Sequence, residues 1–260
     1  MSLQLLQRGL RFARQLMTAP SVPIEPAPQR PTPASWSDEA LTAANLGHAT
    51  VLMNFYGLKL LSDPVLGRRC GINVGPSIFG PKRMTHPALK VREIPPLDLL
   101  ILTHAHMDHL DLWTLRRLRQ RCVAVTPART ADLLRGLRFS RVIELGWGEE
   151  AEIETAHGAV TVSAHRLRHW GARLQNDDFR GYNCYLLERD GKRVCIAGDT
   201  AFTKAAASLR RPGGIDLMAV PIAAYEPWIN SHCTPEEAVA EALNGATVPA
   251  GDPGHDPLSS

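Results

Sequence analysis

Three histidines and one aspartate stand close together in the stretch LTHAHMDHLD, as His104, His106, Asp108 and His109. Neutral imidazoles and a carboxylate are ligands that zinc and similar divalent ions prefer. In an extended segment, residues i and i+2 point the same way, so His104 and His106 can converge on one ion. A turn after them would let Asp108 and His109 reach a second point nearby. The stretch therefore predicts a metal site; the alternative interpretation is a polar loop that happens to be rich in histidine.

Further potential ligands follow apolar runs elsewhere in the chain. His169 stands in RHWGAR, shortly after one such run, and Asp199 closes RVCIAGD, directly after a glycine. A metal site needs ligands from several segments, and both residues are predicted to supply them. Asp199 could instead cap a turn, as acids at strand ends often do. His86, His157 and His165 are predicted not to bind metal, although His165 lies only four residues before His169.

Short strands and a few helices must position these residues. The apolar run LDLLILT ends directly before the histidine cluster, and Gly57 and Asp190-Gly191 predict two tight hairpins. Thr234 is the predicted N-cap of the last helix. The predicted strands are 50–56, 58–62, 97–103, 122–126, 159–165, 183–189, 193–199 and 215–222, and the predicted helices are 112–120, 130–136 and 235–243. This mixture predicts an α/β or α+β fold built on a large sheet system.

The composition fits a soluble globular protein, because 44% of the 260 residues are hydrophobic and 21% are charged. The net charge of +3 resides in residues 1–35, which carry four Arg and one Glu, while the remaining 225 residues balance 25 basic against 25 acidic side chains. A nucleic-acid partner is therefore not expected. Five cysteines without CxxC spacing are predicted to be reduced, buried thiols in a cytoplasmic protein.

The N-terminal segment differs from the rest of the chain. Arg8, Arg11 and Arg14 alternate with apolar residues, which predicts a basic amphipathic helix and excludes a good signal peptide. This helix either packs on its own domain or makes peripheral membrane contact through residues 1–18. Six prolines in residues 20–35 predict a semi-rigid linker, so residues 1–35 are separated from a folded domain at 36–260.

Over roughly residues 45–243, the chain resembles the metallo-β-lactamase superfamily. The resemblance rests on GHATVLM, SDPV, GPKR, LTHAHMDHLD, RHWGAR, RGYNCYLL, AGDT, PIAAYEPW and HCTPEEAV. Within that superfamily the chain is similar to the branch of N-acyl-phosphatidylethanolamine phospholipase D and the L-ascorbate-6-phosphate lactonases. The resemblance implies a four-layer αββα sandwich with two metal ions at the open edge between its sheets.

The resemblance also implies ligands and chemistry. In the family pattern, His104, His106 and His169 hold the first metal, Asp108 and His109 bind the second, and Asp199 bridges the two together with a hydroxide. Two ions about 3.5–4 Å apart make water a nucleophile at neutral pH. The implied function is metal-dependent hydrolysis of a phosphodiester, lactone or other ester in a small-molecule or lipid substrate. Two zinc ions are expected, with manganese or iron as alternatives.

Three more residues match family positions, and two of them, Tyr225 and His232, match positions that face the substrate. Tyr225 and His232 are predicted to be catalytic together with Asp108, and His232 would orient substrate or stabilise an oxyanion. The alternative for His232 is that it caps the following helix. His48, in LGHAT, is predicted to have a structural role or to support the metal ligands from behind.

The C-terminal sequence departs from the family pattern. Family members close with a further strand ending in a histidine that binds the second metal, whereas GATVPAGDPGHDPLSS cannot form a central strand. The sandwich is therefore expected to be incomplete at its C-terminus, with His255 as the remaining candidate ligand or as part of a tail. One alternative function is accordingly an inactive or weakly active metal-binding homologue. Another is a nuclease of the same superfamily, with the basic run TLRRLRQR contacting phosphates.

Overall fold

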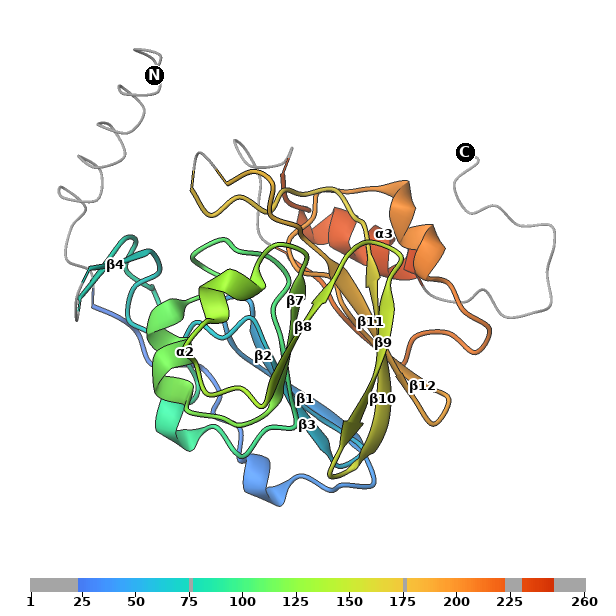
Figure 1. Ribbon diagram of the computed structural model, residues 1–260, viewed down its shortest axis with the longest axis horizontal. Coiled ribbons are helices and arrows are strands. Elements are labelled where there is room, and N and C mark those ends of the chain that lie inside the picture. Colours follow the sequence, from blue (N-terminus) through green and yellow to red (C-terminus); the bar gives the residue numbers. More distant parts are fainter. Residues whose placement is uncertain (1–22, 75–76, 175–176, 223–230, 246–260) are drawn as a thin grey trace, which may run out of the picture. The chain divides into compact units, whose positions relative to one another are not determined.

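The computed structural model describes residues 23–74, 77–174, 177–222 and 231–245 (Figure 1). These residues form two compact units. The first unit takes the described residues up to Glu144, with Thr155–Gly158 and Gly171–Gly181; the second takes Leu145–Glu154, Ala159–Trp170 and the described residues from Tyr182 onward. Each unit is built on one large sheet with short helices. The predicted mixed α/β class is confirmed.

The first unit contains a six-stranded sheet in the order β1-β2-β3-β6-β7-β8. The bounds are β1 Leu41–Gly47, β2 Thr50–Phe55, β3 Leu58–Ser62, β6 Leu99–Ile101, β7 Val123–Pro127 and β8 Arg141–Leu145. β1, β2 and β3 pair antiparallel, while β3, β6 and β7 run parallel. The β2–β3 turn places Tyr56 (φ 51°) and Gly57 (φ 91°) in the left-handed region, as a tight hairpin requires. The hairpin predicted at Gly57 is confirmed.

Strand β6 delivers the histidine cluster. Its three residues, Leu99–Ile101, are fully buried between two parallel neighbours, and such strands read as unbroken apolar runs. The paired region is shorter than the predicted 97–103. Because β6 ends at Ile101, Thr103 and His104 follow at the carboxyl end of the parallel strands, where side chains from neighbouring strands can meet.

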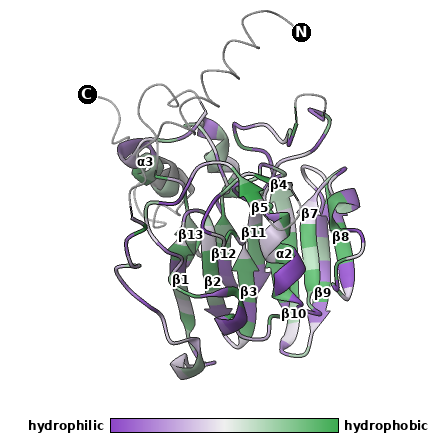
Figure 2. Ribbon diagram, turned by 90° about the vertical axis from the view of Figure 1, so that its left-hand side faces the viewer, coloured by the Kyte–Doolittle hydropathy of each residue, from purple (hydrophilic) through white to green (hydrophobic). Residues whose placement is uncertain are grey.

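Two predicted helices, at 112–120 and 130–136, differ from the elements in the structure. α2, Leu112–Leu118, begins at Asp111, whose carboxylate accepts the N–H groups of Trp113 and Thr114 at 3.0 and 3.2 Å. The helix predicted at 130–136 is instead the 3-10 turn η3, Ala131–Leu134. The Glu144 carboxylate accepts both N–H groups at the start of this turn, and Gly136 (φ 77°) lies just beyond its end. Figure 2 shows apolar residues along the strands and a polar stretch in α2, where two arginines are exposed.

Smaller elements complete the first unit. They are η1 Pro33–Ser35, the hairpin of β4 Ile72–Val74 and β5 Ser77–Phe79, and η2 Val91–Glu93. The described part of the proline-rich segment lies against this unit: Glu25 N–H donates to the Met84 carbonyl at 2.8 Å, and Arg30 pairs with Glu93 at 2.7 Å. The amphipathic pattern of residues 1–18 lies outside the described residues. No helix within the described ranges is both long and apolar enough to cross a bilayer.

The second unit contains a five-stranded sheet in the order β13-β12-β11-β10-β9. The bounds are β9 Glu150–Thr155, β10 Gly158–His165, β11 Cys184–Arg189, β12 Lys192–Ile196 and β13 Leu217–Ala219, with helices η4 Lys204–Leu209 and α3 Pro235–Gly245. Asp190 (φ 50°) and Gly191 (φ 73°) form the predicted β11–β12 hairpin. Thr234 Oγ1 accepts from Glu237 N–H at 3.2 Å, while Glu237 accepts from Thr234 N–H at 3.0 Å. The predicted N-cap of α3 is therefore confirmed, and the two reciprocal hydrogen bonds form a capping box.

The cysteines are free thiols. Four are buried, whereas Cys70 is only half-buried, so the prediction of full burial is wrong for that residue. Burial raises the pKa of Cys70 to about 11 and the pKa of Cys122 to about 12. Both thiols therefore stay protonated near neutral pH and are poor nucleophiles.

Candidate metal centre

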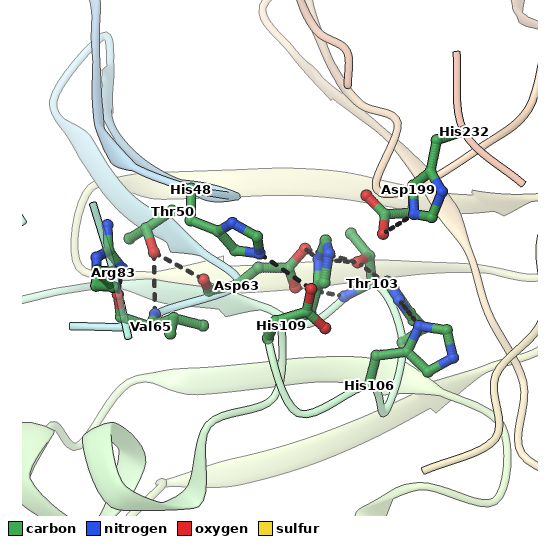
Figure 3. Close-up of polar contacts among 12 residues, drawn as sticks. His48, Thr50, Asp63, Val65, Arg83, Thr103, His106, His109, Asp199 and His232 are labelled. Atoms are coloured by element: carbon green, nitrogen blue, oxygen red, sulfur yellow. Dashed lines mark hydrogen bonds and ion pairs between the residues drawn. The ribbon is translucent and has the colours of Figure 1, made fainter. Parts of the chain in front are cut away.

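In the first unit, three side chains from two segments come together. His48 stands in the turn between β1 and β2, and His109 belongs to the loop after β6 (both are labelled in Figure 3). Asp108 belongs to the same loop. One potential ligand atom from each lies within 4.8 Å of those from the other two. His48 Nε2 is 3.1 Å from Asp108 Oδ2. The His48 and Asp108 side chains are each 42% exposed, while that of His109 is 2% exposed, so this group is open on one side.

His104 and His106 also converge, as their spacing predicts. His104 Nε2 lies 2.8 Å from His106 Nδ1, and the two rings meet edge to face with centroids 4.3 Å apart. Two imidazole nitrogens so close together repel unless a proton or a cation lies between their lone pairs. This pair can therefore share either the proton of an N–H···N hydrogen bond or a metal ion.

Asp63 fixes the orientation of the histidines through hydrogen bonds. Its carboxylate accepts the N–H and O–H of Thr103 at 2.8 and 2.6 Å, and it lies 2.8 Å from His109 Nδ1. Because an ionised carboxylate can only accept, Nδ1 of His109 carries a proton, and in the neutral ring Nε2 then keeps its lone pair for a metal. The Thr103 hydroxyl donates to Asp63, so it accepts from His104 Nδ1 at 3.0 Å. His104 Nε2 is likewise left as a lone-pair donor.

The role of Asp63 is not evident from the sequence alone. SDPV matched the family pattern, yet nothing in that stretch announces a partner 40 residues away. The structure explains the contact: Ser62 pairs with Ile101 in the parallel β3–β6 ladder, and Asp63 N–H donates to the Ile101 carbonyl at 3.0 Å. An acid directly after one apolar strand, beside a second strand that threonine and histidine follow, is the available signal.

Arg173 holds the loop that carries the ligands. Its Nη1 donates to the carbonyls of Ala105 and Leu110 at 2.9 and 2.7 Å, across the turn that contains His106, Asp108 and His109. Burial lowers the pKa of the Arg173 guanidinium. A half-buried cation bound to two carbonyls stiffens that turn. This role was also missed, since Arg173 follows RHWGA without any pattern that links it to residues 105–110.

Replacing Arg173 with methionine is expected to destabilise the loop. Two buried carbonyls would lose their donor, and an unsatisfied buried group costs about 1–3 kcal/mol. Urea unfolding should show a loss in that range, and affinity for divalent metal should fall with it. Arg117→Met is the control, because Arg117 is an exposed arginine that donates to one carbonyl, of Trp113, at 3.1 Å. Equal stability in the two variants would show that Arg173 does not clamp the loop.

In the second unit, three predicted site residues meet around one carboxylate. Asp199 Oδ2 lies 3.1 Å from His232 Nε2 and 3.9 Å from His169 Nε2 (Figure 3 shows the first contact). His169 Nδ1 donates to the Ser231 carbonyl at 3.3 Å, so its Nε2 faces Asp199 with a lone pair. The side chains of His169, Asp199 and His232 are 0, 13 and 22% exposed. This group resembles that of the first unit in its donor types.

Backbone contacts fix the loops that carry His169 and Asp199. Asp199 follows β12 after Gly198, whose φ of 64° allows the chain to turn sharply. Ala201 N–H donates to the Arg168 carbonyl at 2.9 Å, and Arg168 N–H donates to the buried Thr200 hydroxyl at 3.1 Å. His169 and Asp199 each stand next to a residue that makes these two hydrogen bonds. The contacts therefore fix the distance between the two loops.

The remaining site predictions have different outcomes. Tyr225 and His255 lie outside the described residues. His86, His157 and His165 belong to no group of three or more potential metal ligands in the part of the chain that the structure describes. His165 instead contacts the Ser163 hydroxyl at 3.0 Å, and burial lowers its pKa. His232 approaches Asp199 rather than capping α3, whose cap is Thr234.

The donor set fits a divalent metal. Imidazole nitrogens with carboxylate oxygens suit zinc, iron or manganese, and hydrogen bonds to the opposite ring nitrogens already select the ligand atoms of His104, His109 and His169. Such support on the far side of each ring is typical of metal-binding histidines.

Comparisons with known proteins agree with this chemistry. Residues 61–249 match the family described as Beta-lactamase superfamily domain. N-acyl-phosphatidylethanolamine-hydrolyzing phospholipase D 1 of Caenorhabditis elegans is 31% identical over 217 residues, which cover 78% of this chain and 60% of that protein. The chain thus spans less than two thirds of the length of this relative.

Solved structures share the fold. The isothiocyanate hydrolase from Delia radicum gut bacteria matches with a TM-score of 0.59 and 22% identity, over 79% of this chain and 82% of that one. CmlA, a diiron β-hydroxylase from Streptomyces venezuelae, matches with a TM-score of 0.55 and 22% identity, over 79% of this chain and 43% of that one. These proteins differ in chemistry, so the fold does not by itself specify the reaction.

Proposed function

The chain belongs to the beta-lactamase superfamily, and from that premise we propose that it is a metal-dependent hydrolase of a phosphodiester, lactone or other ester. The observation that carries the proposal is the hydrogen bonding behind the histidines. Asp63 and Thr103 hold His109 and His104 in the tautomers that expose Nε2, at 2.8 and 3.0 Å. A merely polar, histidine-rich loop would not need buried partners that select one tautomer of each ring.

The residues of the site have two proposed roles, as metal ligands and as groups that contact the substrate. His104, His106, Asp108 and His109 in the first unit, and His169 and Asp199 in the second, are the proposed ligands; that both sets serve one dinuclear centre follows from the family pattern alone. Two bound divalent ions would supply water that ionises near neutral pH and would polarise the ester oxygen. His232, whose Nε2 is 3.1 Å from Asp199, is proposed to orient substrate or donate to its developing negative charge. Tyr225 is proposed to face the same substrate.

A phosphodiester is the favoured substrate class within this proposal. The C. elegans relative is named for hydrolysing an N-acylated phospholipid, and its 31% identity is the support for a lipid-like phosphodiester here. Zinc is the proposed metal, with iron and manganese as alternatives that the same ligands accept. A cytoplasmic location, with peripheral membrane contact through residues 1–18, belongs to the same proposal.

Removal of metal tests the function. The purified full chain should hydrolyse bis-p-nitrophenyl phosphate or a simple lactone, should lose that turnover after chelation and dialysis, and should regain it with Zn²⁺, Mn²⁺ or Fe²⁺. Metal content measured on the same samples should rise and fall with activity. Turnover that persists in metal-free protein would contradict the proposal.

The same assays separate the alternatives. Bound metal without turnover on any of these esters would identify a metal-binding homologue without activity. Cleavage of RNA at low salt would identify a nuclease instead. The basic run at 114–121 is the feature that such a nuclease would use to contact phosphates. One of its arginines, Arg117, already stacks over the Trp113 ring at 4.0 Å, which is a structural contact at the surface.

A further inference from the structure

His48 occupies a turn that is held in an unusual backbone conformation. Gly47 (φ 106°) and His48 (φ 55°) are both in the left-handed region, at the bulge where β1 turns into β2. Histidine adopts this conformation far less readily than glycine does. A non-glycine residue kept there by its surroundings points to a role for its side chain.

The turn is fixed to the segment that supports His109. A Cβ atom on Gly47 would lie 2.5 Å from Arg83 Nη2, so the arginine packs directly on the turn. Arg83 in turn donates to the Val65 carbonyl at 2.7 Å. Thr50, two residues beyond His48, donates to the Asp63 carbonyl at 2.9 Å and accepts from Val65 N–H at 2.9 Å (Figure 3). His48 is therefore positioned by the same strand end that positions Asp63.

From this geometry we propose that His48 is itself a ligand, through Nε2, of the metal ion that Asp108 and His109 bind. The inference rests on the proposed metal-dependent function. Nε2 of His48 lies 3.1 Å from Asp108 Oδ2, and the rings of His48 and His109 meet at 65° with centroids 5.8 Å apart. In a tetrahedral site with bonds of 2.0–2.2 Å, ligand atoms lie about 3.3–3.6 Å apart. The His48 and Asp108 atoms, at 3.1 Å, already lie at about that separation, and all three donors, within 4.8 Å of one another, need to contract by about 1 Å at most.

The side chains have the freedom for that contraction. His48 and Asp108 are each 42% exposed, whereas His109 is locked by Asp63. In the ligand arrangement the His48 proton resides on Nδ1, and Nε2 gives its lone pair to the ion. The competing role is a hydrogen bond from Nε2–H to Asp108 that only orients this carboxylate. Glutamine can imitate that hydrogen bond, but it is a poor ligand for zinc.

The experiment compares metal binding by four forms of the full chain: wild type, His48→Gln, His48→Asn and His157→Gln. Apo protein is titrated with Zn²⁺ by calorimetry, and bound ions per chain are counted after dialysis. His48→Asn favours the left-handed backbone and cannot reach the ion, so it protects the conclusion against a disturbed turn. His157→Gln is the matched control, since His157 Nδ1 lies 3.0 Å from Asp98 Oδ1 and its side chain is 45% exposed.

Wild type and His157→Gln are expected to bind two ions. His48→Gln and His48→Asn should keep the tighter ion and bind the other at least 10–100-fold more weakly, a loss about as large as that from disturbing a ligand's support. Thermal unfolding of the apo forms should be alike. Wild-type affinity for both ions in His48→Gln would overturn the inference while leaving the proposed function standing. A wild-type chain that binds no metal would overturn both.

Discussion

Asp199→Ala is expected to lose both bound metal and hydrolytic activity. Asp199 Oδ2 is the atom that His232 and His169 approach, at 3.1 and 3.9 Å, so its removal takes the anionic donor from between two imidazoles. Turnover should fall by at least the roughly 100–1,000-fold that the loss of one transition-state-stabilising group costs. Steady-state kinetics and metal content on the same preparation measure the effect.

Two further variants test whether the loss is due to the Asp199 carboxylate itself. Asp199→Asn keeps the shape of the side chain and removes its charge, so a similar loss would assign the effect to the carboxylate. Asp216→Ala, in the same unit, removes a carboxylate that binds Arg193 N–H at 2.8 Å and Lys192 at 3.2 Å, and it should retain metal and activity. Full activity in Asp199→Ala would end the proposed mechanism, whatever metal the chain binds.

The local part of the fold and of the site could be predicted from the sequence. His104 and His106 converge, as the two-residue period of an extended segment predicts. The hairpins at Gly57 and Asp190-Gly191 were predicted because left-handed turn residues are specific. Apolar runs identified the buried strands β2, β3, β6 and β11, because burial on both faces of a strand leaves a continuous apolar pattern.

What depends on register and on distant partners could not be predicted. Strands β8 and β9 read RVIEL and EAEIET; both are largely exposed, and their charged residues conceal the alternation. The role of Asp63 depends on the β3–β6 register, and the role of Arg173 depends on where a loop more than 60 residues away turns its carbonyls. No short pattern encodes either contact. The supporting residues are thus less visible than the ligands, although they decide which nitrogen of each histidine is available.

That dependence makes Asp63→Asn the most informative change behind the ligands. The asparagine is nearly the same size, but one of its two atoms is an N–H₂ group that donates. Thr103 N–H can keep the carbonyl oxygen, whereas His109 Nδ1, now facing a donor at the former 2.8 Å contact, must accept. The His109 proton then moves to Nε2, the nitrogen proposed to bind metal. Zinc affinity at the Asp108–His109 ion should fall about 10–100-fold, as for other partners behind metal-binding histidines.

Asp98→Asn provides the matched control, because Asp98 also binds a histidine nitrogen, His157 Nδ1 at 3.0 Å, and a backbone N–H, of Lys59 at 2.8 Å. It should lose comparable folding stability and bind zinc normally. NMR of the imidazole nitrogens in apo protein separates the tautomers directly: wild-type His109 should carry its proton on Nδ1, and in Asp63→Asn it should carry it on Nε2. If the proton stays on Nδ1 and zinc binds as tightly as in wild type, the ligand atom of His109 is not selected by Asp63, and the observation that supports the metal-dependent function loses its force.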